Sequence, residues 1–301
     1  MNIEVPDDVI VFVRDLFSGC NRQVSADLST FPAIHEESLD MNLISAFARR
    51  QAPVRLASDW IVRIDAHFIG GGRHFGTWEV ADIGLIMAFR HKGKVIKSKL
   101  ALLQSKKLYA NSLKYTEEGR HVRRFGLGRL IVTEEEHAEH IQPRVLAFER
   151  SSRYQAYQKH SDQQKTMGHF QRRWATEMYY LFYNPLAIPH AMKMPLEQQP
   201  ELGDNSVGSR VVQKTRLDES LKPFEVGYSP SYQDLLDKLS GNLEGTPSSA
   251  GWRLEDFAAE LMLKCKAGLV DESPTFESLL ILMNQKRQPI SGAISVTFDI
   301  R

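Results

Sequence analysis

The chain has only two cysteines among its 301 residues, and it lacks any long apolar run. Cys20 and Cys265 cannot build a disulfide framework or a cysteine-rich zinc site, so we expect both to be small buried apolar side chains. The longest apolar runs, such as residues 9–13 and 100–103, are far shorter than the roughly 20 residues of a membrane-spanning helix. The first residues lack the basic start and apolar stretch of a signal peptide. Together these absences predict a cytoplasmic protein with no membrane partner.

Net charge is also nearly absent, at +1, but the charges are unevenly distributed along the chain. Residues 218–260 carry nine acids and three bases. Residues 90–116 carry no acid and eight bases, which are Arg90, Lys92, Lys94, Lys97, Lys99, Lys106, Lys107 and Lys114. A basic surface favours polyanions, because their binding releases condensed counterions. A solvated strand-and-turn surface explains the basic tract equally well, so charge alone does not identify a partner.

Hydrophobic periodicity predicts alternating helices and strands in the first part of the chain. In chain order it indicates a helix, three strands, a polar helix and a fourth strand, over residues 31–50, 59–69, 78–90, 95–106, 151–177 and 178–183. The nearly continuous apolar residues 100–103 are typical of a strand covered on both faces. Because helices and strands alternate along the chain, we expect an α/β fold with a mixed central sheet flanked by helices.

The texture of the sequence changes near residue 190. Many of the prolines and glycines fall in residues 185–250, where we expect long loops. The pattern then predicts three helices and a final strand, over residues 231–239, 253–267, 276–284 and 293–300. We accordingly divide the chain into a core over residues 1–190 and a C-terminal α+β extension over residues 191–301, whose role the sequence does not indicate.

Two of the expected strands bring polar residues to one end of a hairpin. Depending on the length of the turn near Gly93, Asp82 lies opposite Leu103 or opposite Gln104. Gln104 and Lys106 are two residues apart, so they share one face of their strand. Carboxylate and amide oxygens suit Mg²⁺ or Mn²⁺, and a lysine beside a metal-bound water can orient that water.

This arrangement resembles the PD-(D/E)XK superfamily of restriction-endonuclease-like nucleases, over about residues 31–185. The resemblance implies that Asp82 is the family's aspartate and that Lys106 is its lysine. Gln104 stands where the family more often has an acid, and this Gln-x-Lys form is similar to that of Mrr-like branches. The implied fold is a restriction-endonuclease-like mixed sheet flanked by helices.

The resemblance also implies the remaining parts of a metal site. In the family an upstream helix supplies a glutamate, which here is Glu37 or its neighbour Glu36, and the backbone carbonyl of Ser105 adds a further ligand. With Asp82 and Gln104 these groups would hold one Mg²⁺ or Mn²⁺. The implied activity is metal-dependent hydrolysis of phosphodiester bonds in DNA, with RNA as an open alternative.

Partners follow from the same resemblance. It implies a DNA endonuclease of a bacterial restriction or anti-phage defence system, gated by an ATPase or helicase partner, and a homodimer is compatible with cutting two strands. The bases that we expect to hold the nucleic-acid backbone are Arg73, Lys92, Lys94, Lys107, Lys114, Arg120, Arg123 and Arg124.

Other interpretations of the same residues stay open. Glu79 can lie opposite Lys106 and form an ordinary surface ion pair, and Gln104 can simply satisfy a backbone group. A rival function from another class is a catalytically degenerate subunit that keeps the fold and binds DNA or a partner protein. Loss of cleavage with retained binding in an Asp82→Ala variant distinguishes the nuclease from this rival.

Overall fold

The computed structural model describes residues 3–68, 80–111, 144–194, 201–239, 250–264, 266–271 and 290–300. Its strands are β1 (Val54–Arg55), β2 (Ile61–Phe68), β3 (Ala81–His91), β4 (Lys94–Lys107), β5 (Arg144–Phe148), β6 (Met178–Tyr183), β7 (His190–Met194), β8 (Arg210–Gln213), β9 (Trp252–Arg253), β10 (Leu269–Asp271) and β11 (Ile290–Ile300). Within these residues the centre of the molecule is a nine-stranded sheet in the order β1-β2-β11-β3-β4-β6-β8-β9, with β10 also paired to β4. The pairs β11–β3 and β4–β6 are parallel and the others are antiparallel, so the predicted mixed α/β sheet is confirmed.

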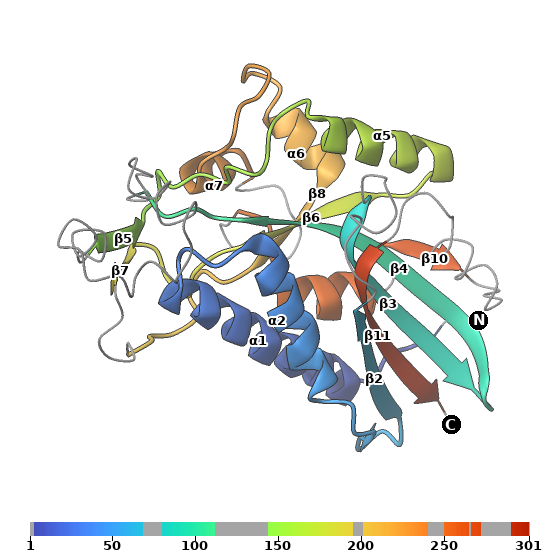
Figure 1. Ribbon diagram of the computed structural model, residues 1–301. Helices are drawn as coiled ribbons and strands as arrows, with labels where there is room; N and C mark the ends of the chain where they lie inside the picture. The colour runs from blue at the N-terminus through green and yellow to red at the C-terminus, as the bar shows by residue number, and fades with distance from the viewer. Residues whose placement is uncertain are drawn as a thin grey trace, which may run out of the picture.

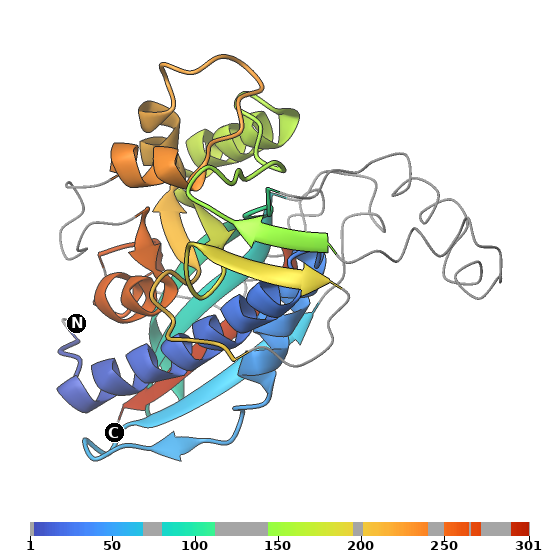
Figure 2. The same cartoon turned by 90° about the vertical axis from the view of Figure 1, so that its left-hand side faces the viewer.

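Helices cover both faces of this sheet (Figure 1). They are α1 (Asp7–Thr30), α2 (Glu36–Ala48), α5 (Asp162–Trp174), α6 (Lys214–Ser220), α7 (Tyr232–Leu239), α8 (Leu254–Asp256) and the π-helix η4 (Phe257–Met262). The first two lie on one face with α8 and η4 against α1, whereas α5, α6 and α7 lie on the other face (Figure 2). Among the described helices, none has the length and apolar character that crossing a membrane requires.

The longest helix, α1, is an element that the periodicity analysis did not identify. It begins after Pro6 and buries an apolar stripe that includes Val9, Val13, Phe17 and Val24. These residues recur at intervals of four and seven, which is the helical spacing. The signal was therefore present, and the stripe packs against α2 and η4 to form one layer of the core.

Two predicted helices are shorter in the structure than in the sequence pattern. The helix expected over residues 31–50 is α2, which begins at Glu36, after Pro32 and a turn. The polar helix expected over residues 151–177 is α5, whose N-cap is Ser161. The hydroxyl oxygen of Ser161 accepts a hydrogen bond from the backbone N–H of Gln164, which fixes the start of α5. A left-handed residue at its C-cap ends the helix.

The β3–β4 hairpin contains a bulge that sets its register. The chain turns through Lys92 and Gly93, whose positive φ angles of 50° and 77° are those of a two-residue hairpin turn. Beside Phe89 the ladder then slips by one residue, because Ile96 is an extra residue in β4. The bulge therefore decides which residues meet at the far end of the hairpin.

Beyond the bulge, the paired positions continue to Ile83 opposite Leu103. One residue further along each strand, Asp82 comes opposite Gln104. This is the second of the two registers that the sequence left open. The turn itself has the short two-residue form, so the bulge rather than a longer turn produces this register.

The C-terminal part of the chain completes the same sheet. The predicted final strand is β11, which inserts between β2 and β3, antiparallel to the first and parallel to the second. Strands β8 and β9 extend the sheet beyond β6, so the boundary near residue 190 does not separate two sheets. A separate two-stranded sheet pairs β5 with β7. The helix predicted over residues 276–284 lies outside the described residues.

Candidate functional site

The predicted hairpin residues Asp82 and Gln104 contact each other. The Gln104 amide Nε2 donates a hydrogen bond to Oδ2 of Asp82, and the backbone N–H of Ser105 donates to the same oxygen at 2.6 Å. Both bonds fall on the same oxygen, Oδ2. Asp82 is half-buried, whereas Gln104 is only 1 % exposed.

The environment of Asp82 disfavours its negative charge. Desolvation by the surrounding protein raises the pKa of Asp82 well above its ordinary value, and the neighbouring carboxylate of Asp40 raises it further. The ammonium of Lys106 lowers the pKa of Asp82 but does not outweigh these two effects. A cation bound beside Asp82 would therefore stabilise its ionised form.

The third predicted residue, Lys106, reaches the upstream helix. Its ammonium lies 3.1 Å from Oε1 of Glu36, in the first turn of α2. The other oxygen of Glu36 accepts a hydrogen bond from the backbone N–H of Lys107 at 2.8 Å. The sequence named Glu37 first and Glu36 as its alternative. The structure brings Glu36 to the hairpin, while Glu37 is exposed on the adjacent side of the helix.

A further acid, Asp40, belongs to this cluster and was not identified from the sequence. Its Oδ1 accepts hydrogen bonds from the hydroxyl of Ser105 at 2.5 Å and from the phenol of Tyr183 at 2.6 Å. Asp40 follows Glu36 by four residues, which places both on one face of α2. That spacing was the signal that could have found it. Burial raises the pKa of Asp40 to about 7, and the nearby charge of Glu36 contributes to this increase.

The cluster has the donor chemistry of a divalent-cation site. The ammonium of Lys106 pairs with Glu36 and interacts electrostatically with Asp40 and Asp82, so one lysine serves three carboxylates. In the described residues, Oε1 of Gln104 is buried and has no hydrogen-bond partner. An unpartnered amide oxygen next to an excess of negative charge fits Mg²⁺ or Mn²⁺.

The described side chains do not form a complete metal-binding site. No group of three His, Cys, Asp or Glu residues is close enough to bind a metal ion among the residues that the structure places. Gln104 supplies an amide oxygen in place of an acid, so the arrangement has one carboxylate ligand fewer than a site with an acid at this position. The role of the Ser105 carbonyl as a ligand stays a prediction.

The predicted nucleic-acid contacts divide into three groups. The prediction that Lys107 contacts nucleic acid at the surface is wrong. Its side chain is 3 % exposed, and its ammonium donates to the carbonyls of Pro32 and Ile34. Lys92 and Lys94 are exposed at the tip of the hairpin, at the opposite end of β4 from Gln104. The calls that lie outside the described residues are Arg73, Lys114, Arg120, Arg123 and Arg124, together with Glu79, the alternative partner of Lys106.

Burial also changes the meaning of the basic tract. Lys99 is fully buried, and its ammonium donates to the carbonyls of Met262 and Ala267, each at 2.7 Å. With Lys106 and Lys107 it makes three lysines of the tract that serve contacts inside the protein. The tract is therefore less basic at the surface than its composition indicates.

No family model matches the chain, and neither a curated protein nor a solved structure does.

Proposed function

We propose that the protein is a metal-dependent phosphodiesterase with a restriction-endonuclease-like core. Within that class we propose a DNA endonuclease that uses Mg²⁺ or Mn²⁺. The observation that carries this proposal is the convergence of four side chains, those of Glu36, Asp82, Gln104 and Lys106. The amide oxygen of Gln104 is buried and lacks a hydrogen-bond partner among the described residues. Apart from Gln104, which stands where the family more often has an acid, these are the residue types and positions that the resemblance to the nuclease superfamily implies.

The order of the elements supports the same proposal. With the two-residue strand β1 and with β5, which belongs to the separate two-stranded sheet, left aside, the chain order is a helix (α2), three strands (β2, β3, β4), a helix (α5) and a strand (β6). The second and third of these strands form the hairpin, and the fourth lies parallel to the third after the helical crossover. Strand β11 is an addition to this scheme, because it inserts between β2 and β3.

Each residue of the cluster has a defined part in the proposed reaction. The oxygens of Asp82, Gln104 and Glu36 would hold the metal ion, which when bound lowers the pKa of water and stabilises negative charge on a phosphate. Lys106 would orient the attacking water through its ammonium. Ser105 positions two acids at once, because its N–H binds Asp82 and its hydroxyl binds Asp40.

The wider setting is part of the proposal and rests on the resemblance alone. We propose a role in bacterial restriction or anti-phage defence, with an ATPase or helicase as partner and with a homodimer as the arrangement that cuts both strands. RNA is the alternative substrate. The tests below use the isolated chain with DNA, so they address the chemistry before the partners.

Cleavage of plasmid and linear DNA in Mg²⁺, Mn²⁺ and EDTA tests the proposal. We expect cleavage by the unmodified protein with either metal, none in EDTA, and loss of cleavage with retained DNA binding in Asp82→Asn and Lys106→Ala variants. Cleavage that persists in both variants would exclude this site. Calorimetric binding of Mn²⁺ that disappears in Asp82→Asn would locate the metal independently of catalysis.

One observation favours a second function, a non-catalytic subunit that binds DNA or a partner protein. The polar groups of the cluster already satisfy one another in part, since Gln104 donates to Asp82 and Lys106 pairs with Glu36. A degenerate nuclease fold would retain such a closed set of contacts. Absence of both cleavage and Mn²⁺ binding, with DNA binding intact, would favour this subunit over the nuclease.

A further inference from the structure

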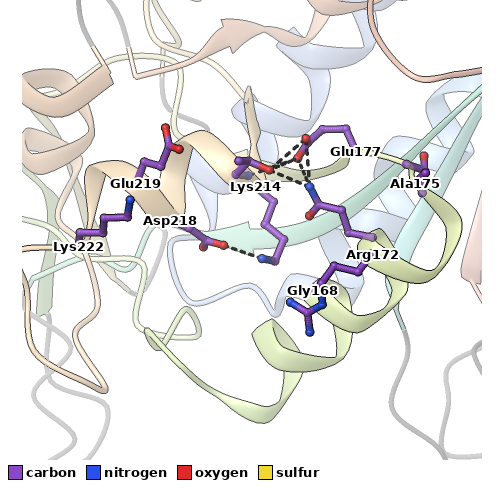
Figure 3. A pocket seen from close by; sticks show the side chains of 11 residues that line it. Gly168, Arg172, Ala175, Glu177, Lys214, Asp218, Glu219 and Lys222 are labelled. Atoms are coloured by element: carbon purple, nitrogen blue, oxygen red, sulfur yellow. Dashed lines mark hydrogen bonds and ion pairs between the residues drawn. The ribbon is translucent and has the colours of Figure 1, made fainter.

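A polar cavity lies between α5 and α6 (Figure 3), and its lining residues are distinct from the acidic cluster formed by Glu36, Asp40, Asp82 and Lys106. It has a volume of about 670 Å³, and an adjoining cavity of about 370 Å³ shares several of its lining residues. The residues common to both are Gly168, Arg172, Lys214, Asp218 and Lys222. Three of these five carry a positive charge, so the shared part of the cavity is basic.

Two of the cations converge above a glycine. A methyl group placed on Gly168 would lie 3.7 Å from Nη1 of Arg172 and 3.7 Å from Nζ of Lys214. Because residue 168 is a glycine, the space between the two charged groups is not filled by a side chain. Arg172 follows Gly168 by four residues on α5, and Lys214 comes from the first residue of α6, so two helices hold the pair.

Three acids, Glu177, Asp218 and Glu219, line the larger cavity, but none of them is paired with Arg172 among the described contacts. Asp218 lies 2.5 Å from the ammonium of Lys214, and this pair is largely buried on the lysine side. Glu177 accepts hydrogen bonds from Gln171 and Thr215 at the edge of the cavity. Among the described residues, the hydrogen bond of the Arg172 guanidinium is to Nδ1 of His169, at 3.3 Å, and not to an acid. An anion in the space between Arg172 and Lys214 would give the Arg172 guanidinium a negatively charged partner.

The cavity lies on the side of the sheet toward which Gln104 points. Tyr180 is the partner of Gln104 in the parallel β4–β6 ladder, so their side chains share a face. The ring of Tyr180 packs against Tyr157, whose hydroxyl accepts a hydrogen bond from Gln164 of α5. Glu177, directly before the start of β6, is three residues from Tyr180, or about 10 Å along the chain. One nucleic-acid strand could therefore approach both places from the same side.

We propose that this cavity binds a phosphate group of a nucleic-acid strand, held by Arg172 and Lys214 above Gly168. The proposal rests on the proposed nuclease function, because it assigns to the same substrate a contact remote from the scissile bond. Arginine presents a planar fork of N–H donors that matches phosphate oxygens, and lysine adds a point charge. A phosphate bound there would fix the strand without reading its bases.

Fluorescence anisotropy with labelled 20-nucleotide DNA and with duplex DNA tests this assignment in EDTA, where cleavage does not interfere. We expect Arg172→Gln to weaken binding about tenfold at 0.1 M salt, and to reduce the log–log salt slope by about 0.7 for the single strand, as for one lost phosphate contact. Arg173→Gln is the matched control, since it makes the same charge change at the next residue of α5. We expect it to keep the affinity within twofold.

A second pair of variants tests the space above Gly168 itself. Gly168→Glu places a carboxylate between the two cations, so we expect it to weaken binding at least as much as Arg172→Gln. Gly168→Ala adds only a methyl group in ordinary contact distance, and alanine favours the helix, so it should retain the melting temperature and weaken binding less than Gly168→Glu does. Titration with inorganic phosphate and with a mononucleotide distinguishes a free phosphate ligand from a strand.

The outcomes separate this proposal from the nuclease proposal. If the unmodified protein binds DNA and all four variants bind equally well, the cavity assignment is wrong and the nuclease proposal stands. If inorganic phosphate binds at this cavity but Arg172→Gln leaves DNA affinity unchanged, the assignment to a strand is wrong. If the unmodified protein binds no nucleic acid, both proposals fail together.

Discussion

The ammonium of Lys106 and the carboxylate of Glu36 join strand β4 to the first turn of helix α2 at a distance of 3.1 Å. The two side chains are 4 % and 20 % exposed, so the pair lies almost entirely within the protein. The second oxygen of Glu36 binds the backbone N–H of Lys107, and this contact fixes the orientation of the carboxylate. Glu37, its neighbour in the sequence, is exposed.

This difference gives a matched pair of variants. We expect Glu36→Gln to reduce metal-dependent cleavage by about 10–100-fold, the range for loss of a group that positions or holds a metal. Glu37→Gln removes the same charge from the same helix turn, and we expect it to change the cleavage rate by less than twofold. Initial rates on plasmid DNA at saturating Mg²⁺ provide the measurement. Equal loss in both variants would show that the net charge of α2, rather than the contact, matters.

The Lys106–Glu36 pair also predicts a loss of stability. Removal of one partner from a buried ion pair leaves an uncompensated charge, which lowers the free energy of unfolding by about 3 kcal/mol. We therefore expect Lys106→Met to be destabilised by about this amount in urea denaturation at pH 8 in EDTA. The double variant Glu36→Gln/Lys106→Met should recover part of the loss. A double variant whose loss equals the sum of the two single losses would mean that the groups do not interact.

The sequence identified the end of the hairpin, but not every residue that meets there. Asp82, Gln104 and Lys106 follow from the two-residue period of strands, which requires only local pattern. The choice between Leu103 and Gln104 as the partner of Asp82 depends on the bulge at Ile96, and no turn signal marks that bulge. One extra residue in a strand is fixed by packing across the sheet rather than by local propensity.

The helix residues show a second kind of limit. The choice of Glu37 over Glu36 depended on where α2 begins and how it rotates against the sheet, and a shift of one residue turns a side chain by about 100°. The insertion of β11 between β2 and β3 is a contact between distant parts of the chain. Periodicity predicted that strand and its half-buried character, but it carries no information on the neighbours of a strand.

The raised pKa values of the two aspartates predict how stability depends on pH. Burial raises the pKa of Asp40 to about 7 and the pKa of Asp82 in the same direction. The folded state therefore binds protons more tightly than the unfolded state, so stability in EDTA is present at low pH and falls as pH rises from about 4 through about 7. We expect a decrease on the order of 3 kcal/mol in the unfolding free energy across this window.

Urea denaturation at pH 5 and pH 8 provides the measurement. Asp40→Asn should flatten the profile, because asparagine can still accept the hydrogen bond at its Oδ1 but does not titrate. Mn²⁺ should raise the melting temperature more at pH 8 than at pH 5, since it binds the ionised carboxylates. A stability profile in EDTA that rises between pH 5 and pH 8 would contradict the burial of these two charges.

The buried position of Lys107 predicts that its substitution lowers stability and leaves DNA binding unchanged. Its ammonium donates to the carbonyls of Pro32 and Ile34 and lies 4.4 Å from the ring centroid of Tyr109. We expect Lys107→Met to leave DNA affinity within twofold and to lower the unfolding free energy by about 1–2 kcal/mol, because two buried carbonyls lose their donor. Anisotropy and urea denaturation measure the two effects. A tenfold loss of DNA affinity in a stably folded variant would contradict the buried position.

The same residue gives an independent check at high pH. Desolvation lowers the pKa of the Lys107 ammonium to about 8, below its ordinary value of 10.5. The unfolded state then binds the proton more tightly, so the unfavourable contribution of this group to stability diminishes as pH rises from about 8 through about 10.5. The difference in stability between the unmodified protein and Lys107→Met should therefore change over this window and not between pH 5 and pH 7.

The exposed lysines of the hairpin tip predict an effect that depends on the length of the DNA. Ten residues of β4 separate Lys94 from Gln104, which corresponds to about 33 Å, close to the 34 Å length of ten base pairs. A duplex of 12 base pairs centred on the acidic cluster therefore does not reach Lys92 or Lys94, whereas one of 30 base pairs does.

We expect Lys92→Asn/Lys94→Gln to weaken binding of the longer duplex about fivefold and to reduce its salt slope by about 1.8, as for two phosphates. Asparagine suits position 92, because the backbone there has a positive φ. Anisotropy at several salt concentrations measures both quantities, and equal weakening on the two duplexes would mean that the tip acts through net charge and does not contact the DNA.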